Sequence, residues 1–229
     1  GVLVIVGDID EEYLKQQLLA YVGNFRTKDA PTRKTAVRYQ PVSGWTTYTV
    51  KGWDDAVDVA LSARMPLTFK NYLSACIAVM AIERDLTEAL ADSGMSFEVL
   101  FNCRIYPEER VNMLLSVYQV DAEGLAPGMT GKTAIDALAD VREALSGLAS
   151  KEINDDELKH YKAYLKNQMS VRMKDPQYWV DAMVVRHLDG KDFTTGCDAK
   201  IDAVTADKVK ALLASLSGSS KVEYIISRK

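Results

Sequence analysis

The stretch that comes nearest to a ligand-binding motif is APGMTGKT, at residues 126–133. It fits a relaxed phosphate-binding loop, in which successive backbone N–H groups, a lysine and a hydroxyl hold a nucleotide phosphate and its magnesium ion. Pro127 has no N–H, however, and Ala126 stands where such a loop usually begins with glycine. Phosphate-binding loops also open parallel α/β domains, whereas antiparallel patterns precede this one. We favour a loop before a helix and keep nucleotide binding as a third hypothesis.

Histidines and carboxylates do not assemble into a catalytic site in this sequence. A catalytic zinc ion usually takes three protein ligands, and the chain has only His160 and His187, neither with a second histidine at a chelating offset. Packing or surface roles are the favoured interpretation for both. The acidic runs at residues 54–55 and 155–157 are explained by turns and helix caps. We therefore expect no catalytic residue and no metal ligand here.

The cysteines predict no disulfide framework. Cys76, Cys103 and Cys197 are odd in number, widely spaced and outside any C-x-x-C pattern, which also argues against a thiolate zinc site. Buried free thiols are the favoured interpretation.

Composition limits the partners that the chain can have. With 229 residues, 48% of them hydrophobic, the chain can form one large domain or a domain with a remnant of another. Its net charge is −4 and it has no cluster of basic residues. We therefore expect no nucleic-acid partner, because counterion release needs clustered lysine and arginine. No apolar run approaches the roughly 18 residues of a membrane span, so none is expected.

The first residues suggest how the chain is divided. The apolar run VLVIV at residues 2–6 predicts a buried strand. Asp8 and Glu11 resemble a capping box that starts a helix over residues 9–22, and Gly23 should end it. Residues 24–43 predict a linker because they carry two prolines. We expect residues 1–43 to be the last strand and helix of a preceding domain with its linker, and residues 44–229 to be a second domain.

Alternating and helical patterns then predict the elements of this second domain. Two antiparallel strands at residues 46–50 and 56–65 should meet at a turn over residues 52–55. A capped helix at residues 69–91 precedes a hairpin formed by residues 96–106 and 111–121. Further helices and a closing strand are expected at residues 133–148, 155–172, 177–188, 206–216 and 221–227. The fold class is therefore α+β, with a mostly antiparallel sheet of five or six strands packed against helices.

Three passages, in order along the chain, resemble the pitrilysin-like zinc peptidases, the family of insulysin and mitochondrial processing peptidase. They are VIVGDID at residues 4–10, LSGLASKEINDDEL at residues 145–158, and IDAVTADKV at residues 201–209. The resemblance implies paired α+β domains, of which one carries a zinc-binding H-x-x-E-H helix. This chain lacks H-x-x-E-H, so by resemblance residues 44–229 are a non-catalytic C-terminal domain.

The resemblance also points to positions that could contact substrate. Active relatives often carry an arginine and a tyrosine on the helix-to-strand passage of their second domain, close to the scissile bond. In this chain the arginine is expected within Leu86, Thr87 and Glu88, none of which is an arginine, and Phe97 stands near the expected tyrosine. Phe97 is thus the one candidate for substrate binding, although it lacks the phenol. A direct role in the chemistry is not expected.

The first functional hypothesis is an inactive domain that helps to enclose the substrate chamber of a zinc metallopeptidase. Its partners would be a peptide substrate and the catalytic domain, in the same chain or in a partner subunit. No cofactor is expected in this chain, and zinc is expected in the catalytic domain. The alternative is a stand-alone scaffold or assembly subunit with the same fold. The apolar run at residues 2–6 also suggests a dimer of the isolated chain, and a bacterial source would favour the cell envelope.

Overall fold

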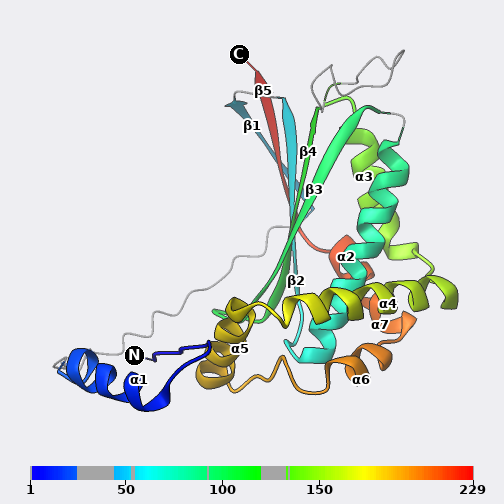
Figure 1. The fold of residues 1–229 in the computed structure, drawn as a ribbon. Coiled ribbons are helices and arrows are strands. Elements are labelled where there is room, and N and C mark those ends of the chain that lie inside the picture. The colour runs from blue at the N-terminus through cyan, green and yellow to red at the C-terminus, as the bar shows by residue number, and fades with distance from the viewer. Residues whose placement is uncertain are drawn as a thin grey trace.

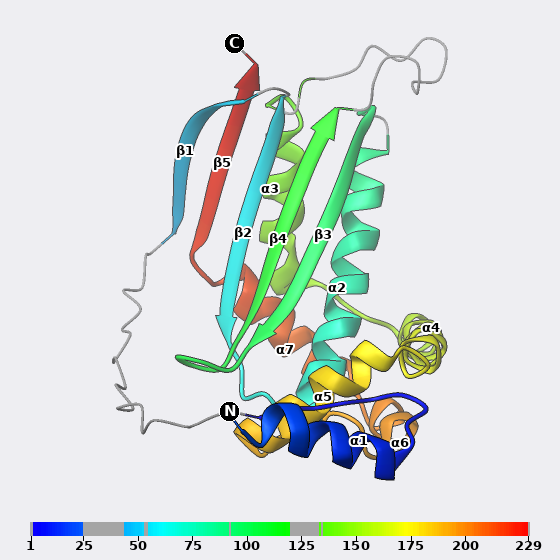
Figure 2. The same ribbon diagram turned by 60° about the vertical axis from the view of Figure 1, so that its left-hand side comes forward.

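A single five-stranded sheet with helices on one face forms the centre of the structure (Figures 1 and 2). The computed structural model describes residues 2–24, 44–52, 55–91, 93–119, 133 and 135–228. The strands are β1 (Trp45–Gly52), β2 (Ala56–Arg64), β3 (Met95–Arg104), β4 (Arg110–Gln119) and β5 (Lys221–Arg228). The expected α+β fold class is confirmed.

In Figure 2 some of the helices lie behind the sheet, and the others lie beneath its lower end. Their bounds are α1 (Glu11–Gln17), α2 (Phe69–Leu90), α3 (Leu138–Gly147), α4 (Asp155–Arg172), α5 (Pro176–Asp189), α6 (Cys197–Asp202) and α7 (Ala206–Ser217). A π-helical turn (Leu18–Val22) continues α1, and a 3₁₀ turn (Leu148–Ser150) continues α3.

The strand order is β1-β5-β2-β4-β3. β5 runs parallel to β1 and antiparallel to β2, so Tyr224 lies opposite Tyr48 on one side and Asp58 on the other. The expected direct pairing of residues 46–50 with residues 56–65 is therefore wrong, although both strands form. Alternation fixes which face of a strand is apolar, but it does not identify the neighbouring strand. Residues 53–54 of the expected turn and 25–43 of the expected linker lie outside the described residues.

Alternation does predict which sheet face is buried. On β2, Val57, Val59 and Leu61 are buried, while the residues between them are only half-buried. β4 repeats the pattern, and its buried side chains point to the same layer of helices. Because successive side chains of a strand point to opposite faces, one face forms the core and the other is left to solvent or a ligand. All buried apolar residues of the described chain fall between Val57 and Leu216.

The long helices begin where their caps predict. Thr68 caps α2, since its hydroxyl accepts a hydrogen bond from the N–H of Asn71 at 3.2 Å. The bounds of α4 agree with the expected residues 155–172. α3 begins five residues later than expected, and the six-residue α6 was not predicted, because so short a helix has too few positions to show a period.

Replacing Asn154 with alanine should lower the free energy of unfolding by about 1 kcal/mol. Asn154 Oδ1 accepts from the N–H of Glu157 at 2.9 Å, and Glu157 Oε2 accepts from the N–H of Asn154 at 3.1 Å. Urea denaturation would measure the loss. Asn167→Ala, on the exposed middle of the same helix, is the matched control and should not destabilise, because alanine favours helix. Equal losses in the two variants would contradict a capping role.

The N-terminal segment differs from its expected form. The helix ends at Gly23 as predicted, but its N-cap is Asp10, whose side chain accepts from the N–H of Tyr13 at 2.9 Å. The capping box at Asp8 is therefore wrong. Residues 2–6 form no strand, and 60% of the Leu3 side chain is exposed, so the predicted buried strand is also wrong. No described strand pairs with these residues, and a strand without a ladder partner or an apolar cover is not stable.

Candidate functional site

The sheet face that points away from the helices is the candidate site, and we call it the open face. Its side chains alternate with the buried ones and come from all five strands: Tyr48, Ala60, Ser62, Leu100, Asn102, Arg110, Asn112, Leu114, Tyr118, Val222 and Tyr224. A hollow of about 920 Å³ lies against β2, β3, β4 and the turn that follows α7. It is large enough to receive a ligand.

A row of hydrogen bonds crosses one end of the open face. Arg110 donates from Nε to Ser62 Oγ at 2.7 Å and from a terminal nitrogen to Ser62 O at 2.9 Å. Ser62 Oγ donates to Asn112 Oδ1 at 2.6 Å, and Asn112 Nδ2 donates to Asn102 Oδ1 at 3.0 Å. The row fixes side chains on β2, β4 and β3. It therefore presents amide and guanidinium groups, which suit the backbone of a polypeptide.

The other end of the open face carries aromatic side chains beside polar ones, since Tyr224 lies opposite Asp58, and Asp58 opposite Ser116. The rings of Tyr48 and Tyr224 stack with their centroids 5.4 Å apart. Tyr118 on β4 is also exposed, and Leu100, which is 53% exposed, lies midway along β3 next to the row at Asn102. Exposed apolar side chains gathered on one surface usually mark a contact with another molecule. The open face can thus bind through apolar contacts at one end and hydrogen bonds at the other.

The structure places Phe97 on the opposite side of the sheet. Phe97 lies on β3 across from Val117, is partly buried and packs against the core with the helices. Leu86 is fully buried in α2, and Thr87 is exposed, with its hydroxyl donating to Glu83 O at 2.8 Å. Substrate binding by Phe97 stays a prediction. The sequence analysis did not identify the open-face residues as a site. The signal was that they alternate with apolar residues along the expected strands.

The described residues do not fit a catalytic zinc ion. No group of three or more histidine, cysteine, aspartate or glutamate residues among them could hold a metal. His160 lies on α4 beside the ring of Tyr161, and His187 is exposed on α5. Residues 126–132 of the expected loop are outside the described part, so nucleotide binding stays a hypothesis. None of the described helices has the length and apolarity that crossing a membrane requires.

The three cysteines are free, and Cys197 is buried, but Cys76 and Cys103 are only half-buried. The prediction of buried thiols thus holds fully for Cys197 alone. Burial raises the pKa of Cys76 to about 11 and the pKa of Cys103 to about 12. Both are therefore protonated at neutral pH and are poor nucleophiles.

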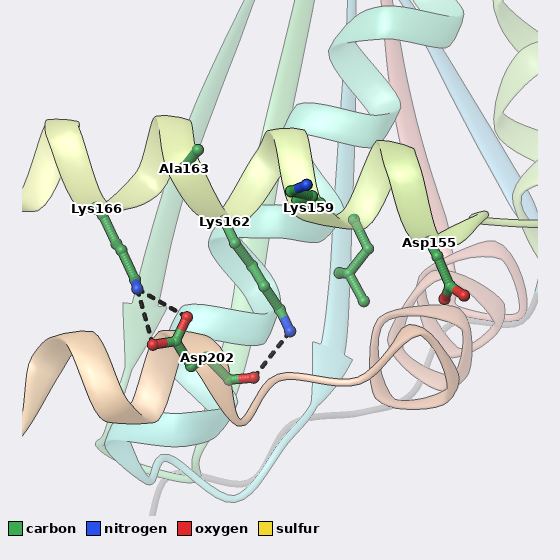
Figure 3. A pocket seen from close by; sticks show the side chains of 7 residues that line it. Asp155, Lys159, Lys162, Ala163, Lys166 and Asp202 are labelled. Atoms are coloured by element: carbon green, nitrogen blue, oxygen red, sulfur yellow. Dashed lines mark hydrogen bonds and ion pairs between the residues drawn. The ribbon is translucent and has the colours of Figure 1, made fainter.

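A smaller hollow of about 390 Å³ lies between α4 and α6. Figure 3 shows two of its lysines directed at Asp202: Lys162 Nζ donates to the backbone oxygen, and Lys166 Nζ to the carboxylate, each at 2.8 Å. Because these ammonium groups hold α6 against α4, we interpret the hollow as a structural contact between helices.

Comparison with solved structures finds the same fold in proteases. A mutant of the ferredoxin protease FusC, in complex with Arabidopsis ferredoxin, has a TM-score of 0.71 at 16% identity over 98% of this chain and 24% of its own. The periplasmic protease PqqL from Escherichia coli has a TM-score of 0.67 at 17% identity over 97% and 25%. The inactive peptidase domain of a Bordetella parapertussis protein has a TM-score of 0.55 at 16% identity over 79% and 96%. The chain has the fold of a pitrilysin-like peptidase domain.

The pitrilysin-like resemblance expected from the three sequence passages is thus confirmed at the level of the fold. No family model and no curated protein matches the sequence. The chain spans about a quarter of the length of FusC and of PqqL. Identities of 16–17% establish the pitrilysin-like fold alone.

Proposed function

We propose that residues 44–229 form a non-catalytic domain of a zinc metallopeptidase, and that the open face is part of the wall of its substrate chamber. The open face carries this proposal. It combines a fixed row of hydrogen-bonding groups around Ser62, Asn112 and Arg110 with the exposed tyrosine pair Tyr48 and Tyr224. An unfolded peptide offers backbone amides and mixed side chains, so it can use both ends.

The protease structures of the same fold support a peptidase context, and the inactive domain from Bordetella supports a non-catalytic role. In this proposal the chain's partners are the peptide and a catalytic domain that holds the zinc ion and supplies the hydrolytic chemistry. The likeness to periplasmic PqqL supports the cell envelope as the compartment.

Residues 1–43 are, in the same proposal, the last strand and helix of a preceding domain with the linker to this one. No residue between 2 and 24 is buried, and Val2, Leu3 and Ile5 are exposed. These apolar side chains would be covered if residues 2–6 joined the sheet of a preceding domain. In the isolated chain the same run would pair with a second copy, giving the expected dimer.

A stand-alone scaffold subunit with the same fold is the second candidate. The inactive peptidase domain from Bordetella favours it, because that domain has the same fold without activity. A scaffold would use the open face to bind a partner protein without any nearby zinc site.

The deciding experiment starts from the natural full-length protein, captured from its source with an antibody against this chain. A zinc-containing protein much heavier than 25.4 kDa would support the peptidase domain. Deleting residues 44–229 from that protein should then lower kcat/KM for an unstructured peptide about 100-fold or more, because the substrate loses its positioning surface. Zinc content should not change. Full activity after the deletion would refute the proposal, and a zinc-free protein of about 25.4 kDa would favour the scaffold.

A further inference from the structure

Three arginines lie side by side at one end of the open face: Arg64 on β2, Arg110 on β4 and Arg104 on β3. We call them the arginine row. Arg110 is the register partner of both others, of Arg64 in the β2–β4 ladder and of Arg104 in the β3–β4 ladder. In Figure 2 the arrowhead of β2 and the turn between β3 and β4 lie together at the lower edge of the sheet. All three side chains line the hollow of about 920 Å³ on the open face.

The arginine row gives this end of the hollow a positive charge. The charged residues that line the hollow are the three arginines and Glu108, a net charge of +2, although the whole chain carries −4. Like charges directly opposite each other on a sheet are destabilising. The row therefore works against the stability of the sheet, and its charge suits a negatively charged ligand.

Glu108 shows how a carboxylate fits the arginine row. Its Oε1 accepts from a terminal nitrogen of Arg110 at 2.7 Å, and its Oε2 accepts from Nε of Arg64, also at 2.7 Å. One carboxylate thus bridges two neighbouring guanidinium groups. Each guanidinium has five N–H donors, and 77% of the Arg64 side chain stays exposed. Arg104 is exposed as well, so a ligand can reach the row from solvent.

The opposite end of the open face carries the opposite charge. Asp58 on β2 and Glu98 on β3 both lie across from Ser116 on β4, in a second row parallel to the first. Glu98 precedes Arg104 by six positions on β3, which is about 20 Å along an extended strand. A ligand carboxylate is therefore repelled at one end of the open face and attracted at the other.

We propose that the arginine row binds carboxylate groups of a polypeptide, so that the open face prefers peptides that carry them. The inference rests on the proposed function, because it takes the open face to bind polypeptide. Guanidinium suits a carboxylate because two N–H groups can donate in parallel to its two oxygens. Nucleic acid fits less well, because Asp58 and Glu98 would repel its regularly spaced phosphates.

The test uses the whole chain and isothermal titration calorimetry with three unlabelled peptides. The first is acetyl-Leu-Tyr-Ser-Glu-Ser-Glu-amide, the second has glutamine in place of both glutamates, and the third is the glutamine peptide with a free terminal carboxylate. At about 0.1 M salt, charges more than about 10 Å apart are largely screened. The first peptide, the third, or both should bind about tenfold more tightly than the second. Their order shows whether side chains or the chain terminus supply the carboxylate.

Two arginine variants locate the binding. Arg64→Gln and Arg104→Gln should each weaken binding of the tighter carboxylate peptide about fivefold or more, and should leave the glutamine peptide within about twofold. Arg64→Gln should fold, because Glu108 keeps its ion pair with Arg110. Arg186→Gln is the matched control, since it removes the same charge from an exposed position on α5 outside the hollow. Its affinities should stay within about twofold of wild type.

A gain of affinity is expected from Glu108→Gln. The substitution removes the carboxylate that already bridges Arg64 and Arg110, so the carboxylate peptide should bind about threefold more tightly or better. Misfolding cannot produce such a gain. Weaker binding than wild type by a variant that circular dichroism shows to be folded would contradict the proposal.

Equal affinity for all three peptides would overturn the carboxylate preference, and so would wild-type affinity in both arginine variants. Tighter binding of a thymidine hexanucleotide than of any peptide would overturn it in favour of nucleic acid. Tyr224→Ala tests the proposed function separately, because it should weaken all three peptides alike, about threefold or more. If no peptide binds at millimolar concentrations, peptide binding by the open face fails together with the arginine row.

Discussion

Replacing Arg142 with alanine is expected to lower the free energy of unfolding by about 2–4 kcal/mol. Glu223 on β5 is completely buried. Arg142 on α3 donates to it twice, from Nε to Oε2 at 3.0 Å and from a terminal nitrogen to Oε1 at 2.7 Å. Without the guanidinium, the buried carboxylate keeps one side-chain donor among the described residues, the Thr47 hydroxyl at 3.1 Å. We place the cost below that of a fully buried pair because 43% of the Arg142 side chain is exposed.

Urea denaturation at pH 7 would measure this loss. Arg64→Ala is the matched control, because Arg64 also pairs with a carboxylate at 2.7 Å but is 77% exposed. It should cost less than about 1 kcal/mol. In a Glu223→Gln background, Arg142→Ala should cost much less, since no charge is left buried. An equal loss from Arg64→Ala, or an unchanged loss in the glutamine background, would show that burial of Glu223 is not the cause.

Leu86→Ala should cost about 2–5 kcal/mol, because it removes a fully buried side chain and leaves a cavity between α2 and the core. Thr87→Ala is the control on the adjacent, exposed residue and should stay within about 0.5 kcal/mol of wild type. Thermal unfolding followed by circular dichroism would compare the two. By the family resemblance, Leu86 lies in the segment where active relatives often carry an arginine. A small effect of Leu86→Ala would mean that this position is not committed to packing.

The sequence predicted those elements whose signals are local. The α2 and α4 helices follow from caps at Thr68 and Asn154, and the β3–β4 hairpin follows from two alternating runs close together in the chain. The position of β5 between β1 and β2 could not be predicted in this way, because no local pattern relates Trp45 to Lys221. The strand predicted at residues 2–6 was wrong because a strand also depends on a neighbour. The run has the apolar pattern of a strand, but no described strand lies beside it.

The site was harder to predict than the fold. Phe97 was chosen by resemblance, and the structure places it against the helices. Ser62, Asn102 and Asn112 lie on three separate strands, and their hydrogen-bonded row exists only once β2, β4 and β3 are adjacent. The arginine row depends on the same strand order, because its members come together only through the register of these strands.

The place of β5 also governs how the protein can fold during synthesis. β1 pairs with β5, beginning at Trp45 and Lys221, and β5 is synthesised last of the five strands. The sheet therefore stays incomplete until residues 221–228 have left the ribosome. β2, β3 and β4 can assemble with α2 earlier, but one edge of β2 is then uncovered. Roughly a hundred residues separate Gln119 from Lys221, so at roughly 5–20 residues per second this edge is exposed for about 5–20 s. Nascent chains of this domain should therefore need a chaperone during that interval, because an uncovered apolar strand edge promotes aggregation.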